Sequence, residues 1–159
     1  MLKKIIIIFI LTALAILELT AFLYFNPETD KDVPILNSIT KPDLDKLSID
    51  NIEINIEIAD NPKEQSQGLS GREYLAPDSG MLFVFPQLIT PSFWMKDMKF
   101  SLDLIWIDEN GKIIEITKNV SPATYPKSFL PPSPIKYVLE VNAGYTEENN
   151  IKAGDEIVF

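Results

Sequence analysis

The sequence predicts an α+β fold: a small β-rich domain with a strongly bent, barrel-like, mostly antiparallel sheet and one or two short helices, after an N-terminal transmembrane helix. Three observations support this fold class. Apolar residues recur at every second position in several short segments, as they do in strands. Few segments carry helix boundary signals, and one long apolar run stands at the N-terminus. Many short strands with few helices favour a small bent or barrel-like sheet. The chain accordingly divides into an anchor (1–25), an extended tether (26–48) and a globular domain (49–159).

The anchor is predicted from the apolar run Ile5–Phe25, which has twenty-one residues. A helix of this length spans about 31 Å, close to the roughly 30 Å hydrocarbon core of a bilayer. Lys3 and Lys4 precede the run and acidic residues follow it. The positive-inside rule therefore predicts a single-pass protein of the cell membrane, with a cytoplasmic N-terminus and the C-terminal domain outside. A cleaved signal peptide, giving a secreted protein, is the alternative, although Leu19 and Ala21 match the A-x-A cleavage pattern poorly.

The tether is rich in proline and charge, with Pro27, Pro34 and Pro42 and no sustained apolar period. Segments of this composition stay extended. The globular domain then opens with a strand over 52–58, in which isoleucines alternate with Glu and Asn. This alternation is typical of a strand with one face in the core and one face in water.

A short helix is predicted directly after this strand. Asn61 can cap it, Pro62 suits its first position, and Glu64 completes a capping box. Gly68 or Gly71 ends it.

The rest of the domain is predicted to be mostly strand. Strands are expected over 80–85, 102–107, 112–120 and 137–142, and at the chain end after Gly154. Asn110-Gly111 favours a hairpin turn between the second and third of these strands. A short helix is expected around Glu147. The proline-rich loop 121–134 either covers one end of the sheet as a lid or fills that end as a packed irregular segment.

The strand 102–107 is the most informative stretch. Its two alternating faces are both largely apolar, which predicts an interior strand. Asp103 shares one of these faces with two isoleucines, and a buried carboxylate needs a partner or a proton. A turn within 97–101 would bring Lys96 within reach of Asp103. The pair is then either a structural ion pair or part of a ligand site.

Composition excludes several classes of function. The 159-residue chain has no histidine and no cysteine, which excludes disulfides, thiol nucleophiles, His/Cys zinc sites and Ser-His-Asp triads. A formal net charge of −9 disfavours nucleic acid as a partner. No phosphate-binding glycine loop or EF-hand spacing is present. No cofactor and no metal are therefore expected.

Five blocks together resemble the domain-of-unknown-function family 192: GLSGREYL (68–75), GMLFVF (80–85), FWMKDMKFSLD (93–103), YVLEVNAG (137–144) and IKAGD (151–155). The resemblance implies a compact β-rich α+β domain, often behind a membrane or signal segment, and no established activity. The chain departs from the family pattern at Ser70, at Asp97-Met98 in place of Asn-Thr, and at Ser101. It keeps the family residues Arg72, Lys96, Asp103, Glu140 and Asn142.

The candidate site combines these charged and amide groups with aromatic walls. Its ligand-binding residues are predicted to be Arg72, Trp94, Lys96, Asp103, Tyr137, Glu140 and Asn142. Aromatic faces beside carboxylates and amides suit a sugar, whose C–H faces stack and whose hydroxyls form hydrogen bonds. The competing interpretation is that the charges pair internally and the aromatic residues are core, which we favour for Trp106 and Phe93.

Two functions follow from these features. The first is a membrane-anchored extracytoplasmic binding or accessory domain for cell-envelope carbohydrate or a protein partner. The second is a carboxylate-dependent envelope hydrolase in which Asp103 and Glu140 are the catalytic pair, since two carboxylates about 5 to 9 Å apart can cleave a glycosidic bond.

Overall fold

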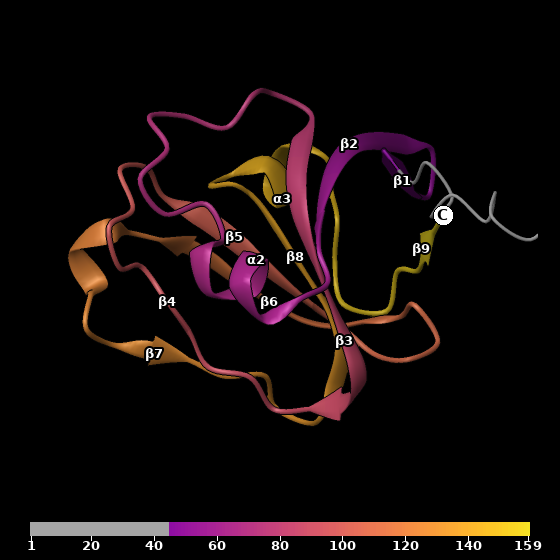
Figure 1. Ribbon diagram of the computed structural model, residues 1–159. Helices are drawn as coiled ribbons and strands as arrows, with labels where there is room; N and C mark the ends of the chain where they lie inside the picture. Colours follow the sequence, from indigo (N-terminus) through magenta and orange to yellow (C-terminus); the bar gives the residue numbers. More distant parts are fainter. Residues whose placement is uncertain (1–44) are drawn as a thin grey trace, which may run out of the picture. The chain divides into compact units, whose positions relative to one another are not determined.

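A computed structural model describes residues 45–159 (Figure 1). The predicted anchor (1–25) and residues 26–44 of the tether lie outside the described residues. Among residues 45–159, no helix has the length and apolar character that a membrane crossing requires. The last tether residues belong to the domain, because its first strand begins at Lys46, three residues before the boundary expected from sequence.

The domain is built on one seven-stranded sheet with the strand order β6-β5-β8-β3-β2-β1-β9. Its strands are β1 (Lys46–Ile49), β2 (Ile52–Ala59), β3 (Ser79–Ile89), β5 (Leu102–Ile107), β6 (Ile113–Val120), β8 (Ile135–Asn142) and β9 (Ile157–Val158). All neighbours are antiparallel except β2 and β3. A separate ribbon pairs β4 (Phe93–Trp94) with β7 (Ser128–Phe129). The predicted strands are confirmed.

The sheet curls until its two edges meet at one end. On one side, Ser48 of β1 pairs with Val158 of β9. Just before β9, Lys112 and Glu156 form a bridge, and the Ile157 amide donates to the Gly111 carbonyl at 2.8 Å. The last strand thus links β1 to the start of β6, which confirms the bent, barrel-like sheet (Figure 1).

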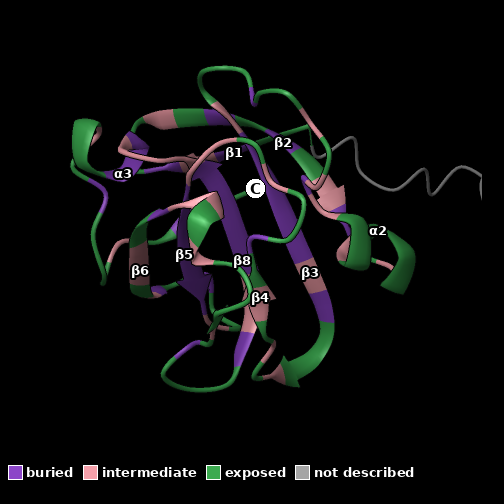
Figure 2. Cartoon of the chain, turned by 90° about the vertical axis from the view of Figure 1, so that its left-hand side faces the viewer, coloured by how far each residue is buried: buried purple, intermediate pink, exposed green. Residues whose placement is uncertain are grey.

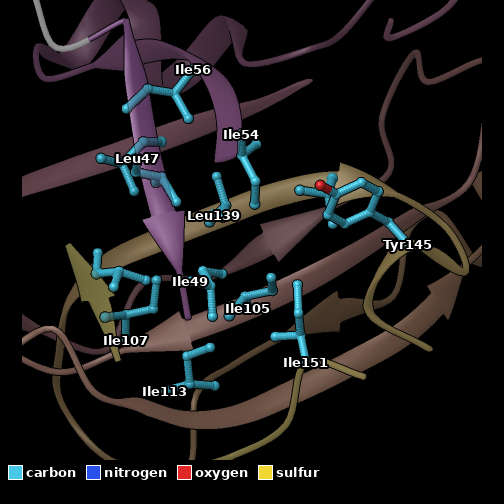
Figure 3. Close-up of a cluster of buried hydrophobic side chains, with 13 residues drawn as sticks. Leu47, Ile49, Ile54, Ile56, Ile105, Ile107, Ile113, Leu139, Tyr145 and Ile151 are labelled. Atoms are coloured by element: carbon cyan, nitrogen blue, oxygen red, sulfur yellow. The ribbon is translucent and has the colours of Figure 1, made fainter. Parts of the chain in front are cut away.

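Two hydrophobic cores lie on the two faces of this sheet. Figure 3 shows the first core, which contains strand side chains such as Ile105, Ile107 and Leu139, together with Ile151 from the segment after α3. The second contains Met81, Phe83, Phe85, Leu102, Leu104, Trp106 and Val138. All six residues of β5 are buried because both of its faces are covered, as predicted for an interior strand (Figure 2).

Two short helices accompany the sheet, as expected. The first, α2 (Pro62–Gln67), is capped by Asn61, whose Oδ1 accepts from the Glu64 amide at 3.0 Å. It ends at Gly68, with φ 49° and ψ −136°, a backbone conformation that favours glycine. The second, α3 (Tyr145–Glu148), follows β8 directly.

The loop 121–134 contains a 3₁₀ turn (Pro122–Thr124) and then β7, through which it pairs with β4. Phe129 of β7 packs against the second core. The loop is thus held to the domain by a short β-ribbon and by an aromatic side chain.

Candidate functional site

A cavity of about 290 Å³ opens between α2, β4 and the sheet. Phe83 and Phe85 of β3 and Glu140 of β8 line its sheet side. The end of α2 and the residues up to Ser70 form one wall, and the segment from Pro91 to Trp94 forms the other together with Met98. Apart from Glu140, every polar lining side chain is a neutral Ser, Gln or Trp.

The β4–β7 ribbon fixes the aromatic wall. Phe93 packs edge-to-face on Phe83 and on Trp106, with ring centroids 4.9 and 5.5 Å apart. Because neighbouring strand residues point to opposite sides, Phe93 in the core leaves Trp94 directed outward. Trp94 keeps 51% of its surface exposed and lines the cavity. It is therefore available to a ligand, whereas Trp106 is fully buried and donates its Nε1–H to Thr117 Oγ1 at 2.9 Å.

The two walls are tied together by a turn after β4. Asp97 has φ 56°, in the left-handed region that Asn and Asp tolerate best among residues with a side chain. Its carbonyl accepts from the Gly71 amide at 2.9 Å, and the Lys96 carbonyl accepts from Ser70 Oγ at 2.9 Å. Asp97 thus fits this turn, and the turn holds the loop after α2 in place.

Glu140 is the chemically unusual residue of the cavity. It is only 6% exposed and pairs in register with Met81 on β3 and Leu104 on β5, both buried. Within residues 45–159 its carboxyl forms neither a hydrogen bond nor an ion pair. Burial without a compensating charge raises the pKa of Glu140 to about 8. At neutral pH the group is therefore mostly a neutral carboxylic acid.

Asp103 lies on the opposite face of the sheet from Glu140. In register, Asp103 pairs with Val141 while Leu104 pairs with Glu140, and successive residues of a strand face opposite sides. Asp103 is completely buried. One carboxyl oxygen accepts from the Asn119 amide at 2.8 Å. The other accepts from Thr146 at the start of α3, from the amide at 3.2 Å and the hydroxyl at 2.6 Å. Asp103 therefore holds β6 and α3 to β5.

The expected pairing of Lys96 with Asp103 is wrong. The partners of Asp103 are amides and a hydroxyl, and Lys96 is exposed on the turn after β4. Lys96 instead lines a second cavity, which shares Trp94 and Ser70 with the first and also includes Asp97.

Three further predicted site residues do not join Glu140. Arg72 makes a bidentate ion pair with Glu57, at 2.5 and 2.7 Å, beside a separate cavity that Glu140 does not line. Asn142 donates to the carbonyls of Leu75 and Ala76, at 3.0 and 3.3 Å, and so anchors the loop before β3. Tyr137 packs on the first core and against Phe159, with centroids 5.7 Å apart. Of the seven predicted residues, Trp94 and Glu140 share the cavity and Lys96 borders the adjoining one.

The sequence reasoning missed the apolar lining of the cavity. Phe83, Phe85, Phe93 and Met98 supply it. Phe83 and Phe85 are two residues apart in one strand, and this spacing places both on the same face. The sequence did not reveal which segments pack against that face to form the cavity. Among residues 45–159, no three acidic side chains gather in a way that could hold a metal ion.

Comparison with known proteins places the domain in a family. The DUF192 profile, described as "Uncharacterized ACR", matches residues 46–159. A solved structure of a proposed transcription regulator from Sinorhizobium meliloti is similar, with 32% identity and a TM-score of 0.66, and the match covers 71% of this chain and 89% of that one. A protein of unknown function from Novosphingobium aromaticivorans is also similar, with 25% identity and a TM-score of 0.68, covering 72% and 84% of the two chains. No curated protein matches the chain significantly.

Proposed function

Because this chain belongs to the DUF192 family, which is uncharacterised, we propose its function from the cavity itself: residues 45–159 form a binding domain for a small polar ligand. One observation carries the proposal. A buried carboxyl group without a partner among the described residues, Glu140, opens onto a cavity walled by aromatic rings. Burying such a group is unfavourable for folding, and perturbed titratable groups in clefts cluster at functional sites.

The shape and lining of the cavity favour a single sugar ring. Its volume of about 290 Å³ lies at the lower end of ligand pockets. The half-exposed Trp94 offers a flat face for the C–H face of a sugar, while Glu140, Ser70 and Ser92 offer hydrogen-bonding groups. Aromatic stacking combined with a few fixed polar groups is the usual means of orienting a small polar ligand.

The predicted setting of the domain is the cell envelope. The apolar run Ile5–Phe25 and the charges around it favour a single-pass anchor with the domain outside the cytoplasm. The partner would then be an envelope polysaccharide, or a protein that carries the sugar. The name of the Sinorhizobium protein suggests a role in transcription for that protein. The net charge of the present domain does not support such a role here. Residues 45–159 hold 18 acidic and 10 basic side chains, a balance of −8 that disfavours nucleic acid.

The paired-carboxylate hydrolase finds no support in the geometry. Asp103 and Glu140 face opposite sides of the sheet, so one substrate cannot contact both. Asp103 is also fully buried and engaged by three hydrogen bonds.

Calorimetric titration of the full chain with glucose, glucosamine and N-acetylglucosamine tests the binding function. We expect saturable binding of at least one sugar, weakened at least tenfold by Trp94→Ala. Tyr137→Phe is the matched control, because this aromatic residue lies on the other face of β8 and its replacement should leave the affinity unchanged. Absence of binding by all three sugars, or equal weakening by both variants, would refute the proposed site.

A further inference from the structure

We propose that the cavity selects a ligand that carries a positively charged amino group, with the Glu140 carboxylate as its counter-ion. For the sugar class considered above, this means an amino sugar with a free amine. The inference rests on the proposed binding function and adds the chemistry that the ligand must present.

The first argument is the missing partner. Among residues 45–159, Glu140 is the only titratable side chain that lines the cavity, and its polar neighbours there are Gln65, Ser66, Gln67, Ser70 and Ser92. The strands on either side contribute the apolar Met81 and Leu104. No described residue thus supplies a cation to this carboxyl, and a positive charge on the bound molecule would fill that role.

The second argument is the nature of the walls. Four aromatic residues, Phe83, Phe85, Phe93 and Trp94, line the cavity. Aromatic faces attract ammonium groups, most strongly where water is excluded. Walls of this kind accept a cation paired with a carboxylate better than they accept a free carboxylate. They would bind an anionic ligand poorly, because the faces of aromatic rings carry partial negative charge.

The surroundings of the cavity also favour a cation. The charged side chains of the adjoining cavity are Lys96 and Asp97, which oppose each other in sign. The described domain as a whole carries the balance of −8, so its field draws cations toward it. The amine can therefore approach without meeting a net positive rim.

Proton release gives this inference a distinctive signature. With its pKa at about 8, Glu140 carries about 0.9 proton at pH 7 in the empty cavity. An ammonium group beside it favours the ionised form and displaces that proton. A neutral sugar that hydrogen-bonds to the carboxylic acid leaves the proton in place. The two ligand types therefore differ in the number of protons released as well as in affinity.

The experiment is isothermal titration calorimetry of the full chain at pH 7, in two buffers of different ionisation enthalpy. Glucosamine, N-acetylglucosamine and glucose are the probes. Acetylation removes the charge of the amine and adds an acetyl group, whereas glucose carries an uncharged hydroxyl in place of the amine. We expect glucosamine to bind at least tenfold more tightly and to release up to about 0.9 proton per molecule bound, while N-acetylglucosamine releases none. Glu140→Gln should abolish the preference. Glu115→Gln, at an exposed position of β6, should preserve both the preference and the proton release.

The outcomes separate this inference from the binding function. If N-acetylglucosamine or glucose binds as tightly as glucosamine, or if Glu140→Gln keeps the preference, the amine selectivity is wrong and the sugar site stands. If none of the sugars binds the wild-type chain, both proposals fail. Should Glu140→Gln unfold the chain, Trp94→Leu serves as the second variant. Loss of the aromatic face should weaken the binding of glucosamine more than the binding of N-acetylglucosamine. Equal weakening of both sugars would overturn the inference.

Discussion

Replacing Glu140 by Gln should stabilise the domain relative to the wild type, and this difference in unfolding free energy should grow as pH rises. Burial raises the folded-state pKa of Glu140 from its ordinary 4.5 to about 8. Below pH 4.5 the carboxyl is protonated in both the folded and the unfolded chain, so the Gln variant and the wild type should unfold with similar free energies. Between pH 4.5 and 8 only the unfolded chain loses the proton. The wild type then loses stability relative to the variant by about 1.4 kcal/mol per pH unit, which amounts to about 5 kcal/mol at pH 8 and above.

The assay is urea unfolding of the full chain from pH 4 to 9, followed by tryptophan fluorescence. Both tryptophans, Trp94 and Trp106, lie in the described domain, so the signal reports on it. The difference in unfolding free energy between wild type and Glu140→Gln should grow from near zero to a plateau near pH 8. Glu115→Gln, at an exposed position, should show a small difference without this rise. A difference for Glu140→Gln that stays constant across the pH range would refute the neutral buried carboxyl.

Four other substitutions test three further features of the structure. Asp103→Asn turns an amide nitrogen toward a backbone donor and should lower the unfolding free energy by about 3 kcal/mol. Thr146→Val removes one hydroxyl donor and should lower it by about 1 kcal/mol. Equal stability of Asp103→Asn and wild type in urea would contradict the role of Asp103 in holding α3. Arg72→Ala removes an exposed ion pair, so it should lower the unfolding free energy by less than about 1 kcal/mol. A loss of several kcal/mol would show that the pair is more than a surface contact. Gly68→Ala places a side chain at a backbone conformation that favours glycine and adds a Cβ 3.3 Å from the Phe83 ring. The resulting strain of about 1–3 kcal/mol should lower Tm and also weaken sugar binding. An unchanged Tm would argue against that strain.

The sheet was predictable from sequence to a useful degree because its signals are local. The strand at 102–107 shows apolar residues on both faces, which is sufficient to predict an interior strand. The cap at Asn61 predicts the start of α2, whereas its end was left open between Gly68 and Gly71 and lies at Gly68. The start of the domain was set three residues late because β1 has only four residues, too few for its alternation of polar and apolar side chains to be distinctive.

The site was less predictable because it depends on register between distant strands. Alternation puts Asp103 on one face of its strand and Glu140 on one face of another, but only the pairing of β5 with β8 decides whether those faces coincide. A shift of one residue would have put both carboxyls on the same side. The partners of Arg72 and Asn142 are likewise set by the tertiary fold, at Glu57 and at the loop before β3.

The pairing of β1 with β9 also has a kinetic consequence. Ser48 and Val158 are neighbours in the sheet although 110 positions separate them along the chain. Contacts of such long sequence separation close late and slow folding, because the entropy of the intervening loop is lost before the contact is gained. The domain must therefore pass through a stage in which β1 and the start of β6 lack the strand that joins them. During synthesis that stage lasts until β9 has emerged, and in that interval exposed strand edges are open to pairing with other chains.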